Sequence, residues 1–146
     1  MKHLALAGAL ALATATSALA EGETHYLAIH VDQADAQVMN MALNNAQNVR
    51  SYYAEQGDEV VIEIVAYGPG LMMLRDDKSP VKGRLSQIQK GSFPSKVTYS
   101  ACGNTKKKME KKAGKSVKIV SQARVVPAGV VRLTELQEQG WTYIRP

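Results

Sequence analysis

Cys102 is the only cysteine in the chain, and its neighbours are those of a reactive thiol. It ends an apolar segment, Lys96–Cys102, and is followed by Gly103-Asn104-Thr105 and then by a lysine-rich run with the composition of a helix. A thiol at the start of a helix lies at the positive end of the helix dipole, which lowers its pKa and favours the nucleophilic thiolate. The cations of Lys106–Lys108, one turn further on, act in the same direction. The sequence therefore predicts a nucleophilic sulfur at residue 102.

Other interpretations of this cysteine stay open. A single cysteine forms no internal disulfide, so the thiol reacts, pairs with another molecule or is an inert core residue, and free cysteines are often buried. His30, near the end of an earlier apolar segment, is a candidate proton partner for the thiol, or else a hydrogen-bonded core histidine. His25 lies five residues earlier on the same expected strand and faces the opposite side, so the pair cannot chelate one metal. We expect no metal and no cofactor.

Residues 1–20 have the three parts of a secretory signal peptide. Lys2-His3 is a short basic start, Leu4–Ala13 is an apolar run, and Ala18-Leu19-Ala20 fits a small-residue cleavage site. A membrane-spanning helix needs about 20 apolar residues, and no segment of this chain is that long. We therefore expect cleavage after residue 20, a periplasmic location, and one domain over residues 21–146 with no membrane span.

The charge of the chain is basic, with a formal net value of +5. Much of it is concentrated at Lys106–Lys118. An exported protein seldom meets nucleic acid, so we do not expect a nucleic-acid partner. The lysines are either a solvated helix surface or a means of attracting anions.

Strand-like and helix-like segments alternate along the chain, which predicts one α/β domain with a parallel sheet of about five strands and helices on both faces. The first helix contains Asn44, Asn45 and Asn48, residues that disfavour helix interiors, so we expect them to hydrogen-bond a neighbouring segment. The expected strands cover residues 26–31, 59–67, 96–102, 124–126 and 141–144. The first expected helix is capped by Asp32 or Asp35 and runs to about Gln56, and the later ones cover 79–91, 105–113 and 130–139.

The unusual residues of this chain follow the expected strands, at the sheet edge where open α/β sheets bind ligands. Asp32 follows the first strand, Gly68-Pro69-Gly70 the second, Cys102-Gly103-Asn104 the third and Pro127-Ala128-Gly129 the fourth. Backbone amides at such glycines and at helix starts bind anions. We therefore predict that an anionic substrate contacts Gly68, Gly70, Gly103, Asn104 and Thr105, although the glycine turn is also compatible with an ordinary tight turn.

These motifs resemble the DsrE/DsrF-like family. The matching residues extend over residues 25–146: Ala42-Leu43-Asn44-Asn45 with Asn48, Val65–Leu71, Ala101–Thr105, Val126–Val130, Gln137, Gly140 and Tyr143-Ile144. The resemblance implies a flavodoxin-like fold and a homo-oligomer, either a trimer or a hexamer. In the sulfur-relay members a cysteine carries sulfur as a persulfide, and Cys102 occupies the matching position. The export signal is a departure from the cytoplasmic relay members, whose usual donors and acceptors would not be present outside the cytoplasm.

Two hypotheses from different classes follow. The first is an exported sulfur carrier, or sulfurtransferase, in which Cys102 takes sulfane sulfur from a donor and passes it to an acceptor thiol. The second is a non-enzymatic, oligomeric module that binds a small anion, with Cys102 as a structural residue. A flavodoxin-type nucleotide-binding protein ranks below both, because the chain lacks a phosphate-binding loop.

Overall fold

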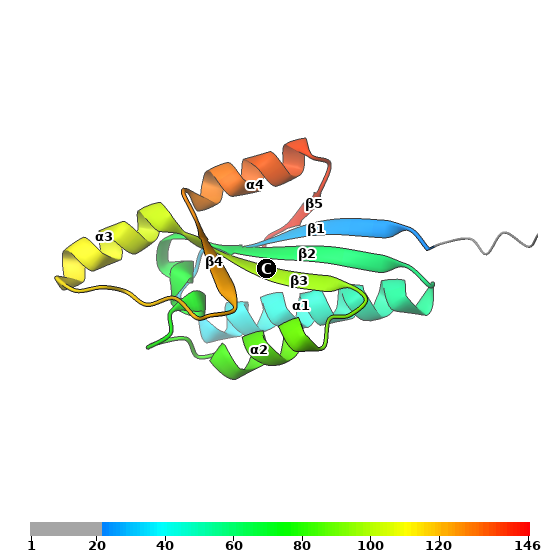
Figure 1. Ribbon diagram of the computed structural model, residues 1–146, viewed down its shortest axis with the longest axis horizontal. Helices are drawn as coiled ribbons and strands as arrows, with labels where there is room; N and C mark the ends of the chain where they lie inside the picture. Colours follow the sequence, from blue (N-terminus) through cyan, green and yellow to red (C-terminus); the bar gives the residue numbers. More distant parts are fainter. Residues whose placement is uncertain (1–21) are drawn as a thin grey trace, which may run out of the picture.

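The computed structural model describes residues 22–146, which form one α/β domain (Figure 1). Five parallel strands make a single sheet in the order β4-β3-β2-β1-β5. This confirms the predicted fold class, whereas the predicted signal peptide lies outside the described residues. The strands are β1 (Thr24–Val31), β2 (Glu59–Ala66), β3 (Lys96–Cys102), β4 (Ala123–Val126) and β5 (Thr142–Ile144).

Helices cover both faces of the sheet unequally (Figure 1). The main core lies between the sheet and helices α1 and α2, and it contains Leu27, Ile29 and Val31 of β1. On the other face α4 alone packs over the sheet, where Leu133 and Leu136 meet Ala28 and Val65. The helical segments are α1 (Ala36–Glu55), the 3-10 helix η1 (Gly68–Leu74), α2 (Lys82–Lys90), α3 (Gly103–Ala113) and α4 (Gly129–Glu138).

The strand order reverses after β4. From β1 to β4 each strand is added on the same side of its predecessor, but β5 returns to the far side of β1. The connection after β3 leads to α3, whose Met109 packs on the α1–α2 side, while the connection after β4 leads to α4 on the opposite face. The two loops therefore leave the sheet in opposite directions. Such a switch point is where open α/β sheets form a ligand crevice.

The local signals in the sequence are confirmed in part. Of the two candidate caps, Asp32 and Asp35, it is Asp35 that caps α1, by accepting a hydrogen bond from the Gln37 amide at 2.6 Å. Ser79-Pro80 does not begin α2, because the helix starts at Lys82. The Ser79 hydroxyl instead accepts from the Val81 amide and donates to the Met73 carbonyl, which fixes the loop ahead of the helix.

Candidate functional site at the switch point

Cys102 is the N-cap of α3. The residue is the last one of β3, and its sulfur accepts a hydrogen bond from the Thr105 amide at 3.4 Å. The helix therefore begins at Gly103, two residues earlier than the sequence pattern predicts. This geometry is that of a capping serine with sulfur in place of oxygen, and it directs the dipole of the first turn at the sulfur.

The Thr105 side chain gives the sulfur a second donor. Its hydroxyl oxygen accepts a hydrogen bond from the Gly68 amide at 2.9 Å, which leaves the hydroxyl hydrogen free to point towards Cys102. Burial raises the pKa of the Cys102 thiol. Hydrogen bonding by the Thr105 side chain and by the amides of Gly129, Thr105 and Asn104 lowers the same pKa by a larger amount. The net pKa lies below the usual value of a thiol, so the site stabilises the thiolate relative to an ordinary thiol.

The sulfur is more covered than the sequence suggests. We expect a thiol at this rim to be uncovered, whereas Cys102 is only 5 % exposed. The β4–α4 connection packs against it: a methyl group on Gly129 would lie 3.3 Å from the Cys102 Cβ and 2.9 Å from the Tyr67 Cβ. The Asn104 amide also donates to the Pro127 carbonyl at 3.1 Å. A reactant must therefore be small, or this connection must move aside.

The predicted substrate-binding residues fall into two groups. Gly68, Gly103, Asn104 and Thr105 lie together with Cys102 at the start of α3. Gly70 lies elsewhere, buried against the end of β1, where a methyl group would approach the Val31 carbonyl oxygen to 2.2 Å. The structure thus gives Gly70 a packing role, and contact of these residues with an anion stays a prediction.

His30 lies on β1, separated by β2 from the strand that ends at Cys102, and its ring contacts other residues. The ring is only 4 % exposed, stacks on Tyr67 with centroids 4.5 Å apart, and shares a 2.8 Å hydrogen bond between Nδ1 and the Tyr143 hydroxyl. Its Nε2 has no hydrogen-bond partner among residues 22–146, and the nearest Asp32 carboxylate oxygen is 4.0 Å away. Arg145 holds that carboxylate at 2.8 Å.

The protonation of His30 follows from this environment. Burial lowers the pKa of the ring most, Asp32 raises it and Arg145 lowers it again, with a net pKa below the usual value. The neutral ring therefore predominates at neutral pH. Tyr67 stacks on His30 and also lies close to Gly129, which packs against Cys102.

Tyr67 and Tyr143 belong to the matched family motifs, but the sequence pattern assigns neither of them a role beside His30. Tyr67 precedes the glycine turn and looks like an ordinary strand end, while Tyr143 lies in a three-residue strand at the sheet edge. Both acquire their positions beside His30 through the strand order, because β5 pairs with β1 only in the folded sheet.

A buried ion cluster stabilises the same face of the sheet. Glu63 of β2 is 2 % exposed and accepts from Ser100 at 2.6 Å, from Arg124 at 3.0 Å and from two nitrogens of Arg132 at 2.8 Å. Burial raises the pKa of Glu63, but the hydrogen bonds from Arg132, Ser100 and Arg124 lower it to about 2. The cluster ties Arg124 of β4 and Arg132 of α4 to Glu63 of β2. It therefore holds both ends of the β4–α4 connection that packs against Cys102.

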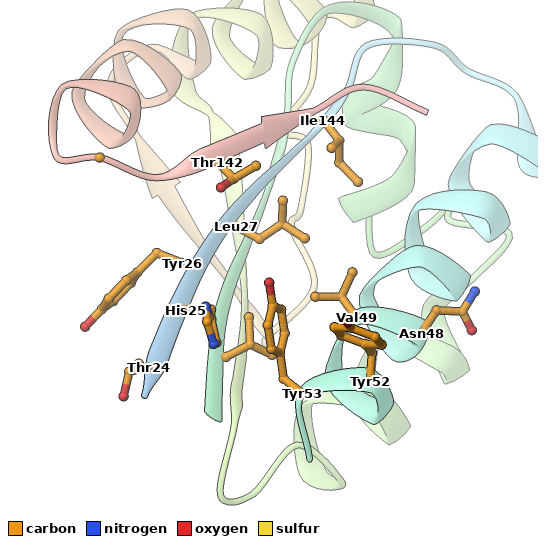
Figure 2. A pocket seen from close by; sticks show the side chains of 12 residues that line it. Thr24, His25, Tyr26, Leu27, Asn48, Val49, Tyr52, Tyr53, Thr142 and Ile144 are labelled. Atoms are coloured by element: carbon orange, nitrogen blue, oxygen red, sulfur yellow. The ribbon is translucent and has the colours of Figure 1, made fainter. Parts of the chain in front are cut away.

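A separate hollow of about 630 Å³ lies at the opposite, amino end of β1. Figure 2 shows that β1, α1 and β5 all contribute to it, with the rings of His25 and Tyr53 side by side. Their centroids are 3.7 Å apart. Asn48, whose helix position suggested a partner, lines this hollow, whereas Asn44 accepts from Arg84 of α2 at 2.8 Å.

Two further observations bear on the class of protein. Within residues 22–146, no group of three or more histidine, cysteine or carboxylate side chains is placed to hold a metal ion. Over the same residues, no helix has the length and apolar character needed to cross a bilayer.

Comparison with known proteins gives a structural likeness only. No protein-family model matches the chain, and no curated protein matches it. The fold is similar to that of MTH1491, a protein of unknown function from Methanobacterium thermoautotrophicum, with 28% sequence identity and a TM-score of 0.68. The likeness covers 84% of this chain and 99% of that one. It supports the fold and assigns no activity.

Proposed function

We propose that this protein is an exported sulfur carrier that holds sulfane sulfur on Cys102 as a persulfide. The observation that carries the proposal is the position of the Cys102 sulfur at the start of α3, where it accepts a hydrogen bond from the Thr105 amide at 3.4 Å. This helix start lies at the switch point of the sheet. A thiolate held in this way is the form that attacks sulfur. The resemblance to the DsrE/DsrF-like family, taken from the sequence motifs, points to the same chemistry.

The transfer needs no metal and no external oxidant. The Cys102 thiolate attacks the terminal sulfur of a persulfide or polysulfide, a new S–S bond forms, and the donor's S–S bond breaks with its electron pair left on the donor sulfur. An acceptor thiolate then attacks the outer sulfur of the Cys102 persulfide and regenerates the thiolate. The amides around the first turn of α3 stabilise the anionic sulfur at both stages.

His30 is the proposed proton partner in this scheme. Its unpartnered Nε2 is able to accept or donate a proton, and burial keeps the ring neutral. Because Tyr67 lies beside it, the proton reaches an incoming thiol through a water molecule rather than through direct contact with Cys102.

The test is to incubate the purified protein with inorganic polysulfide and weigh it intact. We expect a gain of one sulfur atom that dithiothreitol removes and that Cys102→Ser abolishes. No gain, or a gain that survives the substitution, would contradict the proposal. Intact mass also tests export, because the periplasmic protein should begin at residue 21.

The alternative, a small-anion-binding module with a structural cysteine, is favoured by the burial of the thiol. In that case iodoacetamide at neutral pH would alkylate Cys102 as slowly as it alkylates a buried, protonated thiol. The homo-oligomer implied by the family resemblance, a trimer or a hexamer, belongs to both proposals, and sedimentation equilibrium measures its size.

A further inference from the structure

Helix α3 projects from the carboxyl edge of the sheet, beyond the other helices (Figure 1). Only Gly103 of its eleven residues is buried. Met109 packs on the core, and Lys106 pairs with Glu110 on the same inner side. The rest of the helix surface is turned to solvent.

The outer side of α3 is a face of four lysines, Lys107, Lys108, Lys111 and Lys112, which we call the lysine face. All four are exposed, and their spacing puts them on one side of the helix. None of them forms an ion pair with any residue that the structure describes. The only acidic residue of the helix, Glu110, is already bound to Lys106 and to the Val117 amide.

Exposed apolar residues flank the start of the same helix. Val125 is 52 % exposed, and one of its methyl carbons would lie 3.4 Å from a Cβ atom placed on Gly103. Val130 and Val131, 59 % and 52 % exposed, follow Gly129, which packs on Cys102. Exposed apolar residues therefore lie close to Cys102 at the starts of α3 and α4, and the lysine face lies further along α3. Protein–protein interfaces combine apolar and charged residues in this way.

We propose that the lysine face and these valines dock an acidic segment of a partner protein that exchanges sulfur with Cys102. The proposal rests on the proposed function for the identity of the cargo. Four unneutralised lysines along a helix about 16 Å long match an extended row of carboxylates better than one small anion, because they diverge instead of converging on a pocket. The valines match an apolar side chain beside the partner's thiol.

A partner protein explains this surface better than a membrane or a nucleic acid does. Helices that bind bilayers bury large apolar side chains below a basic face, but the one large apolar residue of α3, Met109, is already packed on the core. A single-stranded nucleic acid would stack on aromatic residues, and the lysine face contains none. Neither a bilayer nor a nucleic acid would deliver a thiol to Cys102.

The probe for this proposal is a fluorescent synthetic peptide, Glu-Glu-Leu-Ser-Glu-Glu, in which serine replaces the reactive cysteine. Fluorescence anisotropy should show binding to the wild-type protein that weakens as salt is raised. Replacing the four lysines of the lysine face by glutamine should weaken binding at least about tenfold, since four modest ion pairs are lost together. The matched control replaces Lys78, Lys82, Lys90 and Lys96, four exposed lysines on other elements, and should bind within about twofold of wild type.

A second variant tests the apolar part of the surface without changing the charge. Val130→Ser should bind the same peptide several-fold more weakly than wild type does. A second peptide, with serine in place of leucine, should bind Val130→Ser and wild type equally well. Circular dichroism of each variant shows that α3 is intact.

Several outcomes would overturn the proposal. These are an absence of peptide binding, equal loss in both quadruple variants, or binding of an anionic vesicle or an oligonucleotide as tight as that of the peptide. Salt-sensitive self-association that the lysine-face variant abolishes would also overturn it, because it would assign the surface to a second copy of the chain. Polysulfide loading of the wild-type protein is measured separately, so docking without loading would contradict the sulfur carrier and leave the docking surface standing.

Discussion

The Thr105 amide hydrogen-bonds the sulfur of Cys102 at 3.4 Å, so the one cysteine of this protein is also the residue that caps α3. The helix and the thiol are therefore coupled: the donors left free at the helix start are the groups that stabilise the thiolate. Substitution of Thr105 leaves its backbone amide in place but can remove its side-chain hydroxyl.

Thr105→Val removes the hydroxyl that lies between Gly68 and Cys102. We expect the pKa of Cys102 to rise, since one hydrogen bond to the thiolate is lost. The measurement is the rate of iodoacetamide alkylation as a function of pH. Thr105→Ser, which keeps the hydroxyl, should retain the wild-type profile, as should Thr134→Val on α4. An unchanged profile in Thr105→Val would mean that the hydroxyl does not act on the thiolate.

Gly129→Ala places a methyl group against Tyr67 and Cys102, with contacts of 2.9 and 3.3 Å to their Cβ atoms. Overpacking of this kind costs about 1–3 kcal/mol of the free energy of unfolding, which urea denaturation measures. Gly83→Ala is the control, because a methyl group there meets nothing within 4 Å and α2 gains a better helix former. Equal stability of the two variants would contradict the close packing of the β4–α4 connection.

Glu63 should make stability depend on pH in an acidic window. Its pKa is about 2 in the folded protein and 4.5 in the unfolded chain, so the unfolded state binds more protons between these values. The contribution, on the order of 3 kcal/mol, is fully present above about pH 4.5 and is lost as the pH falls towards 2.

Urea denaturation of wild type and Glu63→Gln at several pH values isolates this contribution. The variant leaves Arg124 and Arg132 without their shared carboxylate, so it should lose about 3–5 kcal/mol at neutral pH and converge towards wild type in acid. Glu138→Gln, at an exposed position of α4, should follow the wild-type curve. Parallel curves for wild type and Glu63→Gln would show that Glu63 does not titrate in that window.

Tyr143→Phe removes the hydrogen-bond partner of His30 Nδ1 and leaves both ring nitrogens unpartnered in a buried position. We expect a loss of about 1–2 kcal/mol in unfolding free energy. Tyr52→Phe is the control, because the Tyr52 side chain is largely exposed. The folded protein holds the pKa of His30 below its usual 6.5, so stability should fall as the pH drops below that value, in the wild type and in both variants. A Tyr143→Phe variant as stable as wild type would contradict a structural role for this hydrogen bond.

The order of strands and helices could be predicted because it depends on local chemistry. Alternating or continuous apolar residues define β1 and β2, Asp35 caps α1, and Gly57 and Gly114 end their helices with positive φ. The predicted start of α2 at Ser79-Pro80 was wrong. The Ser79 hydroxyl hydrogen-bonds the Met73 carbonyl and the Val81 amide within the preceding loop, and helix propensity does not reveal these contacts.

By itself, the sequence determined which atom is the candidate nucleophile, because there is one cysteine and it lies between an apolar strand and a glycine-led helix. Tertiary structure alone decided what surrounds that atom. The strand order brings β4 beside β3, so that Gly129 packs against Cys102, and it brings β5 beside β1, so that Tyr143 reaches His30. These contacts join residues far apart in the chain, and local pattern carries no information about which strand ends meet. The burial of Cys102 and the isolation of its histidine neighbour therefore follow from the sheet's topology.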